Sequence, residues 1–412
     1  MKFVSGTNLD EIQKYQLYIC HTITRAESLL FTRVFELKAI MNINFFPPLQ
    51  LIAFVRIAQG ILYTFDLEFL KRNFLLGGLV CSVYIQRIQQ KVSVIVLRHY
   101  STRFLQSSGT PGETDQVQHL NLPNEIQKQL VGIVSALGFE IVNWFECHKG
   151  IMLQADHDLR NKLSWFSFGI IDRFETARNF IQDENVSIFY RFHLACKYYF
   201  EEYVPLLFER ISTENQSIFL GRLSDTRSME LWIVVLNRHA ALDWGKISRY
   251  ERNHFFRDNF LGIRYYFTRL QGLETRYQCI FFALGNEELH PLDLYLCLSR
   301  MTADELNSLL SRLPDRALFD LFHYFLCWPF QIIFMKVVNN FKHHINRNTF
   351  RNLVISILYK LRKGWYDYRY IDLFESLWSL MSTRYGRFVK EDEELKEVAN
   401  LTLANFVNHH LV

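Results

Sequence analysis

The sequence predicts an all-α protein made of antiparallel helix pairs stacked side by side, an arrangement that can curve into an α-solenoid-like repeat array. Apolar residues recur every three to four positions along most of the chain, which is the period of an amphipathic helix. The 412 residues include only 8 prolines and 17 glycines, too few for the many tight turns of a β-sandwich or barrel. Because a single helix pair cannot bury its own apolar stripe, neighbouring pairs must stack to be stable.

Two helices can be placed from their first residues. Thr302 and Glu305 have the spacing of a capping box, in which each side chain satisfies a backbone amide of the first turn. A core-facing stripe follows at helical spacing: Leu306, Leu309, Leu310 and Leu313. Pro47 and Pro48 should start another helix, since proline fits a first turn. Its apolar face is expected to hold Leu51, Phe54, Val55 and Ala58.

The stretch Lys91–Leu97 is the one place where the pattern suggests a strand. Val92, Val94 and Val96 alternate with other residues and are β-branched. A buried helix that continues from Tyr84 fits the same residues, so both interpretations stay open.

A polar segment rich in serine, glycine and proline divides the chain at residues 107–115. It predicts an N-terminal helical segment over 1–106, which would be a cap or a small domain, and a helical array over 116–412. Within the array, residues 173–223 resemble residues 267–313; in each, two glutamates should end a helix and a proline shortly after them should open the next. This internal similarity predicts repeat units of about one helix pair each.

Composition excludes several classes of function. A balance of 46 basic against 42 acidic residues gives no strong field for nucleic acid or anionic lipid. The seven cysteines form no CxxC pair, which favours buried reduced thiols over disulfides or structural zinc. The longest uncharged runs are too short to span a bilayer. We therefore expect an intracellular protein, cytoplasmic or nuclear and not secreted, with no membrane span.

Two constellations could hold a metal ion. His157 and Asp158 form a His-Asp dipeptide, as in all-α metal-dependent phosphohydrolases, but charged residues that open a helix explain them more simply. Two Glu-x-x-His pairs put carboxylate and imidazole on one helix face, as in di-iron bundles; these are Glu251 with His254 and Glu287 with His290. Chance alone yields about one such pair in a chain of this composition, so no metal or cofactor is assigned.

Basic and aromatic residues interleave over Arg249–Arg269 and again over Lys360–Tyr370. Such mixtures occur in single-stranded nucleic-acid sites, and this function would require four arginines to share one face: Arg257, Arg264, Arg269 and Arg276. Aromatic residues at helical spacing are more often core, with arginines as their solvated flank. Nucleic-acid binding is therefore the third hypothesis.

The function most consistent with these observations is a non-enzymatic scaffold or adaptor that binds a protein or peptide in a groove between helices. No nucleophile elbow, phosphate-binding loop or dinucleotide fingerprint occurs, so no catalytic residue is assigned. Exposed aromatic residues on a concave surface would support this function, with Tyr198, Tyr199 and Tyr203 as the candidates. A metal-dependent phosphohydrolase centred on His157 and Asp158 is the alternative.

Overall fold

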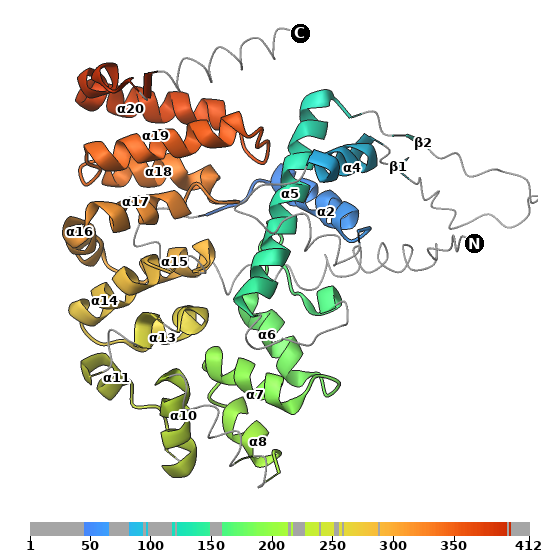
Figure 1. Cartoon of the computed structure of the whole chain (residues 1–412), viewed down its shortest axis with the longest axis vertical. Coiled ribbons are helices and arrows are strands. Elements are labelled where there is room, and N and C mark those ends of the chain that lie inside the picture. The colour runs from blue at the N-terminus through green and yellow to red at the C-terminus, as the bar shows by residue number, and fades with distance from the viewer. Residues whose placement is uncertain are drawn as a thin grey trace, which may run out of the picture.

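The computed structural model is built mostly from α-helices that pack against one another (Figure 1). It describes residues 45–65, 82–93, 96–97, 118–119, 122–148, 159–212, 216, 227–238, 240–250, 255–257, 259–286, 289–393 and 395–396. The helices of its first half are α2 (Leu49–Leu62), α4 (Ser82–Ser93), α5 (Asn124–Cys147), η1 (Leu159–Lys162), α6 (Arg173–Gln182), α7 (Ile188–Lys197) and α8 (Tyr203–Glu209).

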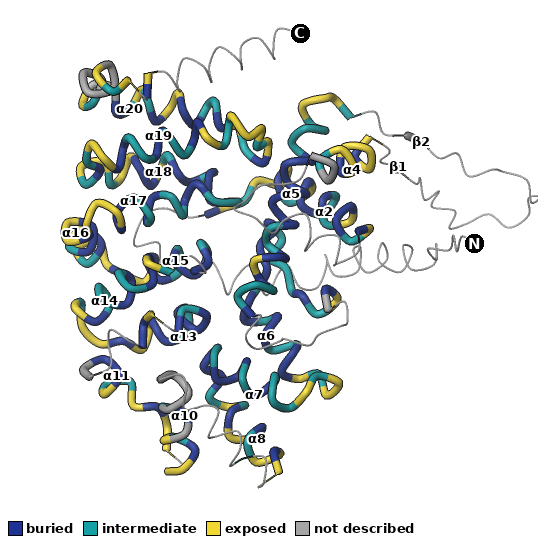
Figure 2. The backbone as a smooth tube through the Cα atoms, viewed as in Figure 1, coloured by how far each residue is buried: buried dark blue, intermediate teal, exposed yellow. Residues whose placement is uncertain are grey.

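The second half continues with α10 (Arg227–Arg238), α11 (Trp244–Tyr250), η2 (Phe260–Gly262), α13 (Ile263–Tyr266), η3 (Phe267–Arg269), α14 (Leu273–Leu284), α15 (Pro291–Leu298), α16 (Ala303–Arg312), α17 (Asp315–Tyr324), α18 (Gln331–Phe341), α19 (Arg347–Arg362) and α20 (Tyr370–Glu391). In Figure 1 the helices from α13 to α20 lie one above another, and α5 runs alongside them in a different direction. Buried residues follow the helix sides that face neighbours, whereas turns are largely exposed (Figure 2).

The longest helix in the described part of the chain, α5, is the centre of this arrangement. It packs against α2 and α4 on one side, and its Gly132 lets the loop before α20 approach closely. A Cβ atom at Gly132 would lie 2.2 Å from the backbone nitrogen of Asp367. By length and composition α5 is the one helix among the described residues that could cross a membrane, but 67% of its most apolar window is buried inside the structure.

Both helices placed from the sequence are confirmed. The hydroxyl of Thr302 accepts a hydrogen bond from the Glu305 backbone, the Glu305 carboxylate accepts one from the Thr302 backbone, and α16 follows. All four leucines of its predicted stripe are buried. Pro48 caps α2, whose predicted apolar residues Leu51, Phe54, Val55 and Ala58 are buried as well.

The stretch Lys91–Leu97 contains parts of both predicted structures. Its first three residues end α4, and Val96–Leu97 form the short strand β1. This strand pairs antiparallel with β2 (Gln118–His119), with Val96 opposite His119. The helical and strand interpretations are therefore each correct for one end of the stretch.

The predicted linker, 107–115, lies outside the described residues. On either side of it, α2 and α4 share one hydrophobic core with α5 and the later helices. The division into 1–106 and 116–412 stays a prediction.

The two similar segments, 173–223 and 267–313, contain α6–α8 and α14–α16 respectively. Pro291 opens α15, as predicted, whereas Pro205 is the third residue of α8, which begins at Tyr203. Glu287, Glu288 and residues 217–223 lie outside the described part of the chain, so the repeat stays a prediction.

Candidate functional site

The predicted metal residues fall mostly where the structure gives no description. His157, Asp158, Glu251, His254 and Glu287 all lie outside the described residues. Within the described ranges, no group of three or more histidine, cysteine, aspartate or glutamate side chains could hold a metal ion. The two metal hypotheses are therefore untested at their central residues.

His290 is described, and it forms a buried clamp between α15 and α5. Its Nδ1 accepts a hydrogen bond from the Leu292 backbone at 3.1 Å, so this side chain caps α15. Its Nε2 lies 3.0 and 3.1 Å from the two carboxylate oxygens of Glu140. Because Nδ1 is an acceptor, Nε2 carries the hydrogen atom and donates a hydrogen bond to the Glu140 carboxylate.

Glu140 joins this clamp to α6. Its carboxylate also accepts a hydrogen bond from the Ile171 backbone at 3.1 Å. Burial raises the pKa of Glu140. Interaction with His290 and the nearby positive charge of Arg173 together lower this pKa by more than burial raises it, so the net pKa lies below its usual value. A buried carboxylate therefore stays ionised between α5, α6 and α15. We call this junction, Glu140, Arg173 and His290, the seam.

Tyr198 and Tyr199 are not surface residues, contrary to the expectation that they would be exposed for partner binding. Both are 0% exposed. They follow the last residue of α7, where the chain reverses with Tyr199 at a φ of 58°. This reversal turns the two neighbouring rings into the interior, which helical spacing in the sequence does not reveal.

Tyr198 contacts a buried histidine that directly follows the last residue of α5. The His148 Nδ1 lies 2.5 Å from the carbonyl oxygen of Trp144, and the His148 Nε2 lies 2.8 Å from the Tyr198 hydroxyl. The carbonyl can only accept, so Nδ1 donates and Nε2 accepts from Tyr198. Burial lowers the pKa of His148 to about 3, with a smaller contribution from the positive charge of Arg173. His148 is thus a neutral structural group.

Tyr199 lies in an aromatic cluster formed by residues distant in sequence. Its ring centroid is 5.5–5.9 Å from those of Trp232, Trp244, Phe255 and Tyr266. Gly262 permits this packing, because a Cβ atom there would lie 2.3 Å from the Tyr199 ring. The interleaved aromatic residues near 249–269 therefore include core residues.

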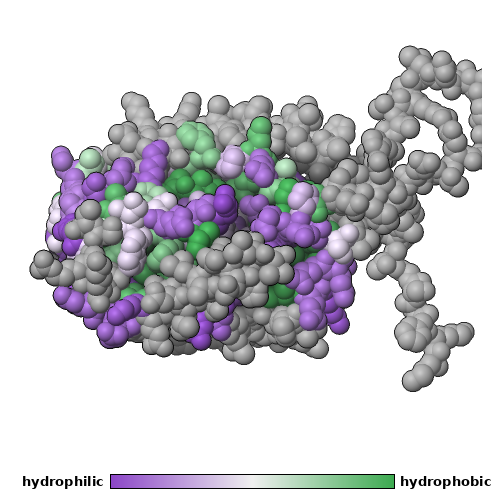
Figure 3. All heavy atoms as spheres, turned by 90° about the horizontal axis from the view of Figure 1, so that it is seen from above, coloured by the Kyte–Doolittle hydropathy of each residue, from purple (hydrophilic) through white to green (hydrophobic). Residues whose placement is uncertain are grey.

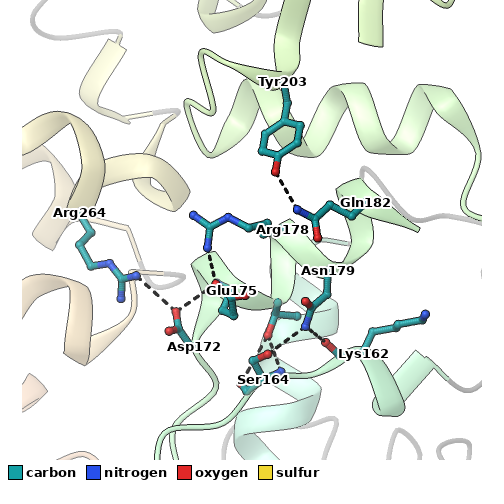
Figure 4. Close-up of polar contacts among 10 residues, drawn as sticks. Lys162, Ser164, Asp172, Glu175, Arg178, Asn179, Gln182, Tyr203 and Arg264 are labelled. Carbon is teal, nitrogen blue, oxygen red and sulfur yellow. Dashed lines mark hydrogen bonds and ion pairs between the residues drawn. The ribbon is translucent and has the colours of Figure 1, made fainter. Parts of the chain in front are cut away.

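Tyr203 is half-buried and belongs to a polar network along α6 (Figure 4). Its hydroxyl accepts a hydrogen bond from the Gln182 side chain at 2.8 Å. One turn earlier, Asn179 donates to the Ser164 hydroxyl and to the Lys162 carbonyl, which fixes the preceding loop to α6. Tyr203 is thus partly accessible to solvent, at the edge of a surface whose side chains are hydrogen-bonded to one another.

The same network links α6 to α13. Asp172 caps α6 through the Glu175 backbone and forms an ion pair with Arg264 at 3.3 Å (Figure 4). Arg264 also lies 4.3 Å from the ring centroid of Phe174, and Arg178 pairs with Glu175. Charge pairs and cation–π contacts therefore connect segments that are about ninety residues apart.

The four arginines predicted for nucleic-acid binding are largely neutralised. Three form ion pairs with carboxylates: Arg264 with Asp172, Arg269 with Glu201 and Arg276 with Glu305. Arg257 lies 5.9 Å from the ring centroid of Phe282. Because nearby carboxylates cancel most of this charge, phosphate groups gain little from approaching it.

A groove lies between α18 and α20. It has a volume of about 580 Å³ and is open to solvent, and its lining residues are Met335, Asn339, Glu375, Ser376, Ser379 and Leu380. The two helices run parallel, since Gln331 bonds the hydroxyl of Tyr370 and Arg384 bonds the carbonyl of Lys342. On the face seen from the α20 end, hydrophobic side chains show between hydrophilic ones (Figure 3).

Four buried cysteine thiols of the helical core are poor nucleophiles. Burial raises the pKa of Cys196, Cys279, Cys297 and Cys327, so these side chains remain protonated thiols near neutral pH. The buried polar groups described above form hydrogen bonds with one another, and these bonds hold neighbouring helices together.

Comparison with known proteins gives no further guide to the function. No protein-family model matches the chain, and no curated protein matches it.

Proposed function

We propose that the chain is a non-enzymatic, intracellular scaffold or adaptor, and that it binds a segment of a partner protein in the groove between α18 and α20. The groove itself is the observation that carries this proposal. In this proposal the stacked helix pairs form a solenoid-like array, which supplies a rigid, extended surface.

The lining of the groove suits a protein segment. Met335 and Leu380 are half-buried apolar residues, while Asn339, Glu375 and Ser376 are exposed polar residues. An amphipathic helix binds such a surface by laying its apolar side chains between two helices, with polar contacts at the rim. Methionine adapts its shape to different partners, which suits an adaptor.

The competing functions receive less support. The arginines that a nucleic-acid site would require are paired with carboxylates. The phosphohydrolase alternative depends on His157 and Asp158, and no observation among the described residues favours it. Metal analysis of the purified protein tests it directly, because stoichiometric iron, manganese or zinc would favour the enzyme.

Differential capture from native lysate tests the scaffold. One bait is the wild-type protein and another carries Ser376→Arg and Ser379→Arg, which fill the groove from exposed positions and leave the core intact. A matched control, Asn124→Arg and Asn143→Arg, adds the same positive charge at exposed positions of α5, away from the groove. A partner retained by wild type and control but lost by the groove variant, and cross-linked to α18 or α20, supports the proposal. Identical captures by all three baits would refute it.

A further inference from the structure

Positive charge is concentrated in the last three described helices. Residues 331–391, which contain α18, α19 and α20, include eleven basic and four acidic residues, whereas the whole chain has 46 and 42. The remainder of the chain is therefore slightly acidic. The nearly balanced charge of the whole sequence conceals this local excess, which creates an attractive field for an anionic partner.

Part of this charge gathers at one corner, where α19 ends and a short loop leads to α20. We call this the basic corner; it comprises Tyr359, Lys360, Arg362, Lys363, Tyr366 and Arg369. Tyr359 and Tyr366 are 45% and 44% exposed, and this end of α19 is largely exposed in Figure 2. The loop is held in place because Trp365 stacks on Phe139 of α5, with ring centroids 5.5 Å apart.

Two of the four cations of the basic corner have no carboxylate partner in the described part of the chain; these are Arg362 and Lys363. Arg369 forms an ion pair with Asp372 at 3.0 Å, and Lys360 interacts electrostatically with the buried carboxyl of Asp367. Lys360 also lies 4.5 Å from the ring centroid of Trp365, and Lys363 lies 5.7 Å from that of Tyr359. The arginines near α13, by contrast, are paired within the protein.

The occupied ring faces favour an acidic protein segment over nucleic acid. Trp365 has Phe139 stacked on it and Lys360 over its ring, and Lys363 lies over Tyr359. Bases need free aromatic faces on which to stack, whereas carboxylates need only the cations and the tyrosine hydroxyls. The neighbouring exposed tyrosines can also contact apolar side chains of a peptide.

We infer that the basic corner binds an acidic segment of a partner protein, with carboxylates at Arg362 and Lys363 and apolar side chains against Tyr359 and Tyr366. This inference rests on the proposed scaffold function and adds the chemistry of a partner. The corner is a separate surface from the residues that line the groove, so the two can be tested independently.

Fluorescence anisotropy with three defined probes tests the inference. The first is a short labelled peptide rich in glutamate and aspartate with interspersed leucines, and the second is the same peptide with every acid replaced by its amide. The third is a short single-stranded oligouridine. The full-length protein is compared with Arg362→Glu/Lys363→Glu and with Lys128→Glu/Lys246→Glu, a control that changes net charge equally. Circular dichroism verifies that both variants remain helical.

The acidic peptide should bind the wild-type protein and the control variant with similar affinity. Its affinity for the corner variant should be at least about tenfold lower. The amide peptide should bind far more weakly than the acidic peptide, and added salt should weaken binding of the acidic peptide. An equal loss of acidic-peptide binding in both double variants would show that the peptide does not bind at the basic corner. If oligouridine bound more tightly than the acidic peptide and the corner variant lost this binding, the inference would be refuted and the ligand of the corner would be nucleic acid. Failure of the acidic peptide to bind would refute the inference, while the groove experiment would still decide the scaffold proposal.

Discussion

Acid should destabilise this protein through His148, because its imidazole is neutral and fully buried in the folded chain. Burial lowers the pKa of His148 to about 3, whereas the unfolded chain has the ordinary value of 6.5. Between these values the unfolded chain binds one proton more than the folded chain. Stability is therefore complete above pH 6.5 and is lost as the pH falls toward 3.

The magnitude follows from the difference between the two pKa values. Each pH unit within this window lowers the free energy of unfolding by about 1.4 kcal/mol. Lowering the pH from about 7.5 to about 5 should thus remove about 2 kcal/mol through His148 alone. His193 and His323, whose pKa values burial lowers to about 4, act in the same direction, so the whole protein should show a steeper dependence than a single group.

Substitution isolates the contribution of His148. His148→Gln removes the titrating group, so the pH dependence should shrink by about 1.4 kcal/mol per pH unit over this range. Tyr198→Phe is the matched control: it deletes the hydroxyl that donates to Nε2 and should cost about 1–3 kcal/mol, but it retains the imidazole and therefore most of the slope. Urea unfolding at several pH values, followed by tryptophan fluorescence and circular dichroism, measures all three proteins. An unchanged slope in His148→Gln would refute the reasoning.

Three further predictions concern stability at neutral pH, measured by urea unfolding. Gly132→Ala should destabilise the protein by more than about 2 kcal/mol, because the new Cβ atom would meet the Asp367 backbone. Its control is Gly60→Ala, where the new Cβ atom meets nothing within 4 Å and should stabilise α2 by about 0.5–1 kcal/mol. Equal effects at both glycines would contradict the packing of α5. Thr302→Ala should cost about 1 kcal/mol by removing the cap of α16, and no change would mean that the cap is dispensable. Glu140→Gln should cost about 3 kcal/mol, because it leaves the buried Arg173 without this opposing charge; a more stable variant would show that the seam gains nothing from the carboxylate.

Features that depend on neighbours within one helix could be predicted from the sequence. The capping box at Thr302 and the apolar face of α2 were predictable, since a first turn and a helical stripe are set by residues three to four positions apart. The mostly helical fold follows from the same local period.

The positions of individual side chains in the candidate site depend on contacts between helices, which could not be predicted from the sequence. The hydrogen bond between His290 and Glu140 joins residues 150 positions apart, and the chain reversal at Tyr199 turns two predicted surface tyrosines inward. Gly132 matters because a distant loop crosses α5 at that point. Sequence spacing encodes contacts along one helix, whereas contacts between helices depend on how the whole chain packs, and no local period carries that information.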